Sequence, residues 1–457
     1  MYLINELEIV KISDQESIIV NLINGNADLV NCEIVNKIQQ KDIENIDNQT
    51  KYQLIERKYA FENEEKYFKF IKSFNNKLID ESNKEEPNFI YIPTFECNLN
   101  CYYCFEKAYK KNSDSFLNLN NNIEELFKVI DSIISKLEQN YQCVFDRKNI
   151  PMLLTGGEPL LCENQGIIEK IIKNCNIREF PVSIVTNGTT IDSYLETFRK
   201  YSIENIQITL DGGKTIHDDI RITHEGLGTY DIIVKNLQSI KKYIKNISVR
   251  INITEKNIKS IKELGDIIKK NSDVEFYVYI MQQEGCYDFE NVIDELEALK
   301  YLYELKSQDD TLENLYIAYH GCKNVDGILG KKNFSPKIKM CSAMRNQYII
   351  DNNGGVYKCW WGMGNKDYLV GKIKDQNVEI DDKLVSYYHD RTIFNLEKCR
   401  NCKYRYLCGG GCSGRLTREN LKKGEVVCPD FSGILNFVLP KEIQKLRNGK
   451  GVYENEN

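Results

Sequence analysis

Six short apolar segments, each followed by an amphipathic helical pattern, dominate the middle of the chain. The segments expected to form strands are residues 89–94, 152–155, 182–187, 205–210, 248–254 and 275–281. Between them apolar residues recur at helical spacing, for example Ile233, Leu237, Ile240 and Ile244. Strands that alternate with helices pair in parallel, because each crossover helix returns the chain to the same end of the sheet. The pattern therefore predicts an α/β domain with a parallel sheet, either open or curled into a partial barrel.

Length, charge and the terminal segment narrow the class of protein further. The 457 residues amount to about three domains at roughly 150 residues each. Acidic residues outnumber basic ones by 67 to 61, so we expect no basic surface for a phosphate backbone and no nucleic-acid partner. The first ten residues do not resemble a secretory signal, and no apolar run approaches the roughly 18 residues of a membrane span. We therefore expect a cytoplasmic protein without a membrane segment.

Sixteen cysteines are the anomaly in such a protein. The cytosol keeps thiols reduced, so metal ligation explains this number better than a disulfide framework. Cys97, Cys101 and Cys104 form a CxxxCxxC motif after the first strand, a spacing that chance would produce about 0.02 times in this chain. A [4Fe–4S] cluster usually takes four cysteines, so a cluster on this loop would keep one iron free for a substrate or cofactor. A zinc loop that lacks one ligand is the alternative.

A second group of cysteines lies beyond residue 319, where helical periodicity fades. Its seven members, of which four follow the pattern Cx2Cx5Cx3C, are Cys341, Cys359, Cys399, Cys402, Cys408, Cys412 and Cys428. Thiolates in this number suit either iron–sulfur clusters or zinc. A region with so little apolar periodicity needs another source of stability, which bound metal supplies. Taken alone, this segment is also compatible with a zinc ribbon.

Three polar blocks directly follow the second, third and fourth strands. They are Gly156-Gly157-Glu158-Pro159, Thr186-Asn187-Gly188 and Leu210-Asp211-Gly212. The carboxyl ends of parallel strands share one edge of the sheet, where α/β proteins bind ligands. Glycines leave backbone groups accessible beside a ligand, Glu158 can accept from an ammonium group, and Pro159 suits the start of a helix. Ordinary strand-to-helix turns would leave the same pattern.

Taken together, the CxxxCxxC loop and these blocks resemble the radical S-adenosylmethionine (SAM) enzymes, and the seven later cysteines resemble the SPASM extension of the peptide-modifying branch. The resemblance covers residues 88 to about 437 and implies a partial (β/α)6 barrel. It implies that a cluster on Cys97, Cys101 and Cys104 binds SAM and reduces it, which yields a 5′-deoxyadenosyl radical that abstracts a substrate hydrogen. It assigns the SAM amino group to the Gly-Gly-Glu-Pro block and further cofactor contacts to Tyr103, Thr186, Asn187 and Asp211, with Arg250 and Asn252 as weaker candidates for the ribose and carboxylate.

The same resemblance implies two auxiliary [4Fe–4S] clusters, three clusters in all. The ligands of the first would be Cys341, Cys359 and Cys412, with Cys322 as the upstream candidate for the fourth position unless that position stays open for substrate. The ligands of the second would be Cys399, Cys402, Cys408 and Cys428. The remaining cysteines lie in or beside apolar runs and are expected to be core thiols: Cys32, Cys143, Cys162, Cys175 and Cys286.

The first 87 residues form a separate small unit in the sequence pattern. Strands are expected at 8–12, 17–23 and 28–32, and helices follow at 33–39 and 51–79. This order fits a winged-helix-like peptide-recognition module at 1–87. The expected domains after it are the radical SAM core at 88–318, the SPASM domain at 319–440 and a polar tail at 441–457.

One departure from the family pattern bears on the substrate. Sulfatase-maturating relatives carry an Asp after the cysteine at the position of Cys359, as a proton acceptor, whereas this chain has Trp360. The difference favours maturation of a ribosomally made precursor peptide, one with a leader and a Cys that enters an intramolecular cross-link, a thioether first of all. Oxidation of a sulfatase Ser or Cys is the alternative, and the non-enzymatic alternatives are a zinc-stabilised peptide-binding protein and an electron-transfer protein. A flavodoxin or ferredoxin is the expected electron donor.

Overall fold

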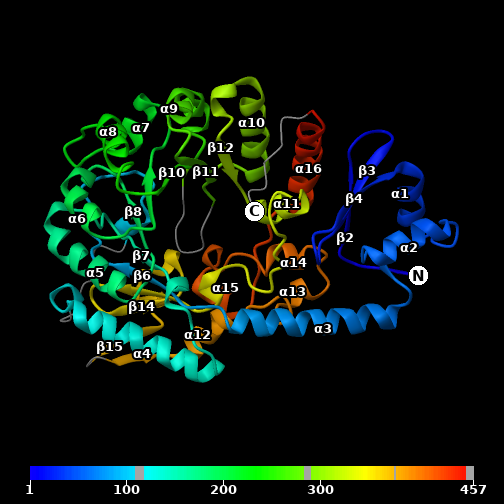
Figure 1. The fold of residues 1–457 in the computed structure, drawn as a ribbon, viewed down its shortest axis with the longest axis horizontal. Coiled ribbons are helices and arrows are strands. Elements are labelled where there is room, and N and C mark those ends of the chain that lie inside the picture. Colours follow the sequence, from blue (N-terminus) through cyan, green and yellow to red (C-terminus); the bar gives the residue numbers. More distant parts are fainter. Residues whose placement is uncertain (109–117, 283–289, 375–376, 449–457) are drawn as a thin grey trace.

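One mixed sheet forms the centre of the molecule (Figure 1). The computed structural model describes residues 1–108, 118–282, 290–374 and 377–448. In these residues the sheet has eleven strands in the order β12-β11-β10-β9-β8-β7-β6-β13-β14-β15-β16. Every neighbouring pair from β12 to β13 is parallel, and the three strands beyond β13 pair antiparallel. The predicted α/β fold with a mostly parallel sheet is confirmed.

The six predicted strands are β6 to β11, and each lies within two residues of its expected range. The parallel strands of the core are β6 (Asn88–Ile92), β7 (Met152–Leu154), β8 (Val182–Thr186), β9 (Asn205–Thr209), β10 (Asn246–Ile253), β11 (Glu275–Ile280) and β12 (Leu315–Ala318). The continuation on the other side of β6 was not predicted as part of this sheet. It consists of β13 (Gln347–Asp351), β14 (Gly355–Tyr357), β15 (Gly371–Lys374) and β16 (Asn377–Ile380).

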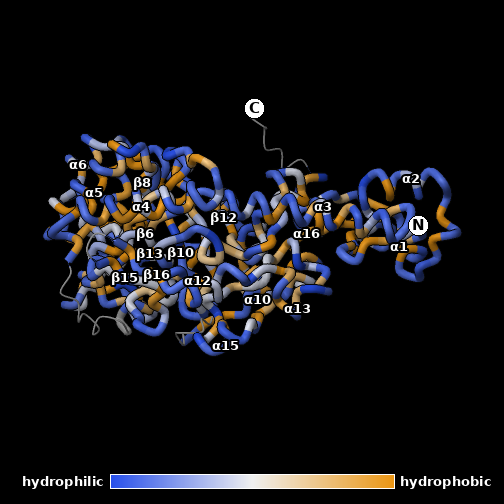
Figure 2. The backbone as a smooth tube through the Cα atoms, turned by 90° about the horizontal axis from the view of Figure 1, so that it is seen from below, coloured by the Kyte–Doolittle hydropathy of each residue, from blue (hydrophilic) through white to orange (hydrophobic). Residues whose placement is uncertain are grey.

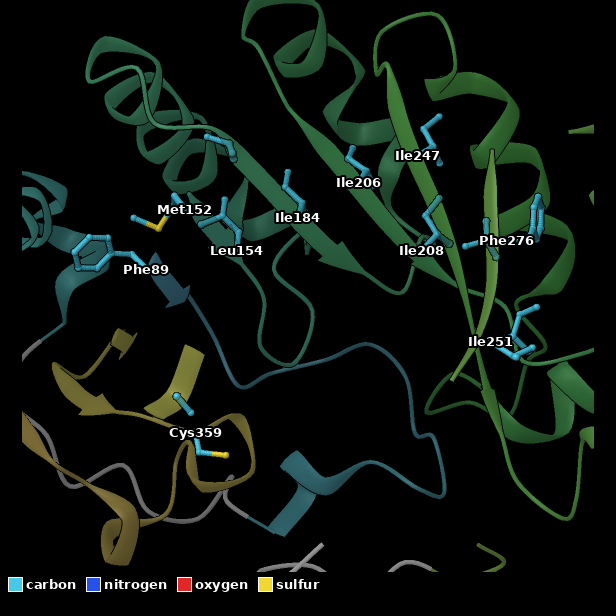
Figure 3. Packing of buried hydrophobic residues seen from close by; sticks show 14 of the residues in the cluster. Phe89, Met152, Leu154, Ile184, Ile206, Ile208, Ile247, Ile251, Phe276 and Cys359 are labelled. Carbon is cyan, nitrogen blue, oxygen red and sulfur yellow. The ribbon is translucent and has the colours of Figure 1, made fainter. Parts of the chain in front are cut away.

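Helices between the strands cover the sheet and bury its apolar side chains. They are α4 (Ile123–Tyr141), α5 (Gln165–Ile177), α6 (Leu195–Lys200), α7 (Lys214–Ile220), α8 (Tyr230–Ile240), α9 (Gly265–Lys270) and α10 (Glu295–Gln308). Figure 3 shows Met152, Ile184, Ile206 and Phe276 on consecutive parts of this core, and all four side chains are fully buried. Burial of each such side chain contributes about 1.5–3 kcal/mol. The core therefore fixes the strand ends from which the site is built.

The N-terminal unit is a three-stranded antiparallel sheet with helices. Its elements are β1 (Tyr2–Leu3), β2 (Leu7–Lys11), β3 (Glu16–Asn21), β4 (Ala27–Asn31), α1 (Cys32–Gln39), α2 (Asn48–Glu56), β5 (Ala60–Phe61) and α3 (Glu64–Asn83). The expected single helix over 51–79 is wrong, because β5 separates α2 from α3. Lys58 adopts a left-handed backbone with φ of 63°, and the buried Ala60 then pairs with Leu3.

This N-terminal unit lies at one end of the molecule and packs against the C-terminal cysteine-rich region (Figure 1, Figure 2). The Glu6 carboxylate is buried and accepts from Arg405 Nη2 at 2.6 Å and from the Tyr67 hydroxyl at 2.9 Å. The Tyr406 hydroxyl donates to Asn75 Oδ1 on α3 at 2.7 Å. The N-terminal unit is therefore joined to the cysteine-rich region through buried polar contacts.

The helices of the C-terminal region are short, except for the long helix at its end. They are α11 (Cys322–Ile328), α12 (Asp382–His389), α13 (Glu397–Arg400), α14 (Arg405–Cys408), α15 (Arg418–Lys422) and α16 (Phe431–Arg447). The expected polar tail from 441 is helical as far as Arg447, because Ile443 is buried and Glu442 binds Lys331 at 2.5 Å. Within the described parts of the chain, no helix combines the length and apolar character that crossing a bilayer requires.

Candidate active site

The CxxxCxxC loop leaves the carboxyl end of β6 and is held against the segment after α7. Leu99 forms an antiparallel bridge with Thr223, and His224 Nε2 lies 2.9 Å from the Cys97 carbonyl oxygen. Burial, the Glu158 carboxylate and the two neighbouring motif thiols raise the pKa of Cys97 to about 12. A thiol in such surroundings ionises when a metal coordinates it. The three motif cysteines therefore lie together in a setting that fits a metal cluster.

The two glycines of the Gly-Gly-Glu-Pro block allow the cluster loop to approach β7. The Gly157 amide donates to the Thr94 carbonyl at 3.0 Å. A Cβ at Gly157 would lie 2.2 Å from the Glu96 carbonyl oxygen and 2.5 Å from that of Phe95. A Cβ at Gly156, where φ is 129°, would lie 2.4 Å from the Thr94 carbonyl oxygen. The backbone that packs against these two glycines therefore belongs to the segment that leads into the cluster loop.

Glu158 links the second and third strand ends. Its side chain is fully buried and accepts from Thr186 Oγ1 at 2.7 Å, from the Asn187 amide at 2.6 Å and from the Leu160 amide at 2.8 Å. Burial raises the pKa of Glu158, and these hydrogen bonds oppose the rise. The next residue, Pro159, lies in the turn ahead of α5 rather than at a helix start. The expected contact of Glu158 with the SAM amino group stays a prediction.

Asn187 brings the third strand end to the cluster loop. Its Nδ2 donates to Asn98 Oδ1 at 2.8 Å and lies 3.8 Å from Cys97 Sγ. Its Oδ1 accepts from the Thr189 amide at 2.9 Å, which fixes the orientation of the side-chain amide. Asn187 therefore points a donor at the sulfur of an expected cluster ligand, and such hydrogen bonds tune iron–sulfur centres.

Tyr103, inside the cysteine motif, ties the loop to the fourth and fifth strands. Its hydroxyl donates to Asp211 Oδ2 and accepts from Arg221 Nη1 at 2.6 Å and from Asn252 Nδ2 at 3.1 Å. The Asn252 amide donates to Asp211 Oδ1 at 2.8 Å, so both carboxylate oxygens have partners. Burial raises the pKa of Tyr103, which keeps its hydroxyl protonated. Arg250 joins the network through Nε, 2.8 Å from Asn252 Oδ1.

Two members of this network were missed in the sequence. Arg221, just after α7, is buried and lies 3.4 Å from Asp211 Oδ2. Burial lowers the pKa of His217 to about 3, so the ring is neutral, and its Nδ1 accepts from the Asp211 amide at 3.1 Å. His217 and Arg221 are four residues apart, which places them on one helix face after the Asp-Gly turn. This spacing of four residues was the feature of the sequence that could have identified both residues.

The four cysteines assigned to the second auxiliary cluster are grouped in the structure. Burial raises the pKa of Cys399 to about 11, and the thiols of Cys408, Cys402 and Cys428 add to the rise. Within the described residues, no three His, Cys, Asp or Glu side chains converge closely enough to hold one metal ion. The ligands of a [4Fe–4S] cluster bind separate irons, so the grouped thiols fit the chemistry of such a cluster.

The cysteines assigned to the first auxiliary cluster come from separate segments. Buried Cys359 follows β14, and the Cys341 thiol acts electrostatically on the neighbouring Lys358 ammonium. Trp361 packs on Phe105, directly after the CxxxCxxC motif, with ring centroids 4.8 Å apart. This contact joins the segment that carries Cys359 to the SAM-cluster loop.

Cys322 begins α11 beside the two auxiliary groups. Its thiol and those of Cys408 and Cys341 all interact electrostatically with Lys337. Burial and the nearby Cys322 thiol raise the pKa of Tyr316, whose hydroxyl donates to Asp326 Oδ2 at 3.2 Å. Cys322 is therefore close enough to both groups to share a cation with them, and its role as a fourth ligand stays a prediction.

We expect Cys322→Ala to remove or alter one auxiliary cluster in the enzyme without peptide, because that cluster would lose a ligand. The loss would be about four irons of about twelve, at four per cubane. Iron analysis and electron paramagnetic resonance (EPR) measure it, with Cys143→Ala as the control. An unchanged resting spectrum, together with a wild-type spectrum that responds only to a Cys-containing peptide, would show an open site instead.

The cysteines expected in the core have mixed outcomes. Cys175 on α5 is fully buried, as predicted, and Cys143 is half-buried. Cys162 is exposed, with its sulfur 3.4 Å from Ser193 Oγ, and Cys32 Sγ donates to the Asp14 carbonyl at 3.0 Å near the surface. The core assignment is therefore wrong for Cys162 and Cys32, and Cys286 lies outside the described residues.

Known proteins that are similar to this chain in sequence or in structure point to the same chemistry as the site does. Residues 91–268 match the radical SAM superfamily. A cysteine-type anaerobic sulfatase-maturating enzyme of Clostridium perfringens is 25% identical over 390 residues, which are 78% of this chain and 96% of the relative. The structure of native anSMEcpe with bound AdoMet and Kp18Cys peptide has a TM-score of 0.57 at 19% identity and covers 79% of this chain and 100% of that one. Streptococcus suis SuiB bound to precursor peptide SuiA has a TM-score of 0.51 at 15% identity and covers 92% of this chain and 99% of that one.

These matches and the site agree on the chemistry of the chain. The family implies SAM and a [4Fe–4S] cluster, and the grouped thiols of the CxxxCxxC loop fit that cluster. The alternatives without enzymatic activity, a zinc-stabilised binding protein and an electron-transfer protein, are therefore set aside. The chain contains a radical SAM domain and is a radical SAM enzyme homologous to the anaerobic sulfatase-maturating enzymes.

Proposed function

We propose that this enzyme modifies a ribosomally made, Cys-containing precursor peptide and joins its Cys to another residue in an intramolecular cross-link, a thioether first of all. The observation that carries the proposal is the N-terminal unit, a strand-rich module fixed to the cysteine-rich region through Glu6 and Arg405. A module in that position can hold the leader of a peptide while the core segment reaches the site. Cys97, Cys101 and Cys104 would hold the cluster, and SAM bound there would supply the radical chemistry that removes a substrate hydrogen.

The chain's own residues would serve this chemistry by positioning. The Glu158 backbone amide, the Asn187 side chain and Tyr103 hold the cluster loop against three successive strand ends, so the loop cannot shift independently of the sheet. Two auxiliary clusters on the later cysteines would accept the electron released when the product bond forms, which makes three [4Fe–4S] clusters in all. A flavodoxin or ferredoxin would donate electrons, and the cytoplasm is the compartment that suits reduced thiols.

The share of the chain covered by each known structure supports the leader-binding role. A match over 79% of this chain need not include any of the first 87 residues. A match over 92% must include more than half of them, and that structure is of SuiB with precursor peptide SuiA. This difference in coverage supports the proposal that the N-terminal unit holds the leader of a precursor peptide.

The β4 edge is the surface to test for leader binding. In the order β2-β3-β4, helix α16 packs against β2, whereas β4 is the other edge strand and carries Leu29 with 45% exposure. An edge strand offers unpaired backbone groups to an extended peptide. We expect Leu29→Lys to weaken precursor binding about tenfold, which corresponds to about 1.4 kcal/mol.

Isothermal titration with the precursor measures this effect, and the rate of SAM cleavage without peptide should not change. The matched control is Ile177→Lys, since Ile177 is 68% exposed but lies at the end of α5 in the central domain. Equal affinity of the Leu29 variant and wild type would dismiss the β4 edge as the leader site.

Oxidation of a sulfatase Cys or Ser is the second candidate function. The 25% identity to a cysteine-type anaerobic sulfatase-maturating enzyme favours it. Against it, the family resemblance implies an Asp proton acceptor directly after the cysteine at the position of Cys359, whereas this chain has Trp360 there.

One assay separates the two functions. The reconstituted enzyme is incubated anaerobically with SAM, a reductant and either a Cys-containing peptide encoded next to its gene or a sulfatase-derived Cys peptide. A thioether product has lost two hydrogens, retains its sulfur and no longer reacts with a thiol alkylating reagent. An oxidised Cys product carries a carbonyl that reacts with a hydrazide. Product of the second kind alone would overturn the proposal.

A further inference from the structure

Arg391 is a buried cation whose hydrogen-bonding groups are mostly unused. The residue follows α12 and is only 3% exposed. Its Nη2 donates to the Glu425 carbonyl at 2.8 Å. Its Nε and Nη1 are shielded from solvent and have no hydrogen-bond partner among the described residues. A guanidinium in this state lowers the stability of the folded protein, because each buried donor without a partner costs about 1–3 kcal/mol of folding free energy, and more when it is charged.

Thiols from both auxiliary groups, together with Tyr388, act electrostatically on Arg391. Burial lowers its pKa, and the thiols of Cys399, Cys412 and Cys341 oppose that change electrostatically. Backbone contacts agree with this position, since Ile393 donates to Ile338, three residues before Cys341, at 3.1 Å. The carbonyl that holds Nη2, at Glu425, likewise lies three residues before Cys428. Arg391 therefore lies between the ligands proposed for the first and second auxiliary clusters.

We propose that Arg391 donates from Nε and Nη1 to sulfur atoms at the two auxiliary clusters and sets their reduction potentials. This inference rests on the proposed pair of auxiliary clusters. Sulfur atoms of thiolate-ligated clusters accept hydrogen bonds, and these bonds with the local charge are among the main controls of potential. A positive donor favours the reduced, more negative cluster. Arg391 thus raises both potentials and makes the two clusters better electron acceptors for the substrate-derived radical.

The test compares Arg391→Gln and Arg391→Lys with wild type in EPR-monitored redox titrations without peptide. The Gln variant loses the charge and is expected to lower both auxiliary midpoint potentials by at least a tenfold change in the reduction equilibrium, about 59 mV for one electron. The Lys variant keeps the charge without the planar pair of donors and is expected to show a smaller shift in the same direction. The signal of the SAM-binding cluster should not move in either variant.

Arg400→Gln is the matched control, because Arg400 is adjacent to Cys399 but exposed, with Nε 3.1 Å from the Phe394 carbonyl. If the Arg391→Gln enzyme keeps its full iron content and its auxiliary potentials are unchanged, the proposed role of Arg391 is overturned. The auxiliary clusters themselves would still stand. If the Gln variant binds no auxiliary clusters, the Lys variant decides, and unchanged potentials in it overturn the proposal. Wild-type enzyme with only about four irons would instead overturn the auxiliary clusters themselves.

Discussion

Replacement of Cys97, Cys101 and Cys104 together by Ala will abolish SAM cleavage and remove about four of about twelve irons, at four per cubane. The three thiols lie on one loop, and those of Cys101 and Cys104 add to the raised pKa of Cys97. The irons of the two proposed auxiliary clusters should stay, because their proposed ligands, from Cys322 onward, lie outside this loop. Iron analysis and chromatographic detection of 5′-deoxyadenosine measure the two effects.

Cys162→Ala is the control for this variant, since Cys162 is exposed and lies on the same domain outside the loop. It should retain all iron and full SAM cleavage. If the triple variant cleaved SAM at the wild-type rate, the CxxxCxxC loop would not be the site of the SAM-binding cluster.

Gly157→Ala is expected to reduce SAM cleavage at least a hundredfold, although it adds a single methyl group. That methyl would lie 2.2 Å from the Glu96 carbonyl oxygen, so the loop that leads into Cys97 must move. The neighbouring Glu158 amide also donates to that carbonyl, at 2.8 Å, and the shift would strain this bond. A displacement of a reacting group by about 1 Å is enough to reduce the rate by about a hundredfold.

The control is Gly166→Ala, because a Cβ at Gly166 in α5 meets no atom within 4 Å. This variant should cleave SAM normally and be more stable by about 0.5–1 kcal/mol, since Ala loses less backbone entropy in a helix than Gly. Thermal unfolding and the SAM cleavage rate measure both variants. Normal cleavage by Gly157→Ala would mean that the loop can rebuild its contact with β7 without cost to the cluster.

The core strands were predictable because their signal is local. Each strand from β6 to β11 is an apolar run bounded by turn residues, and helical spacing separates it from the next. The pairing of β13 with β6 joins Gln347 to Asn88, far apart in the sequence, and periodicity carries no signal for such a contact. The break between α2 and α3 depends on a left-handed residue at Lys58, where Gly or Asn is the usual marker.

Site residues could be predicted where they belong to motifs at strand ends. Buried charged residues whose partners are distant in the sequence could not be predicted. Glu158 and Asn187 were singled out, and the structure brings them to the cluster loop, whose own Tyr103 binds Asp211. Arg221 and His217 were missed because neither belongs to one of the motifs, and in the sequence both have the pattern of ordinary surface residues. Arg221 is buried beside the Asp211 carboxylate, which requires a cation once it is removed from water, whereas the neutral His217 accepts from the Asp211 backbone amide.

The register between β6, β13 and β14 fixes where Cys359 lies along β6 relative to the CxxxCxxC loop. Gln347 pairs with Asn88 at the amino end of β6, and its Nε2 holds the Lys358 carbonyl, next to Cys359, at 2.8 Å. The loop that carries Cys97 instead leaves the carboxyl end of β6 at Ile92, which lies four residues beyond Asn88, or about 13 Å at roughly 3.3 Å per residue. Because hydrogen bonds of the sheet maintain this offset, the segment that carries Cys359 and the start of the CxxxCxxC loop share one rigid frame, and neither can move without breaking the pairing of β6 with β13.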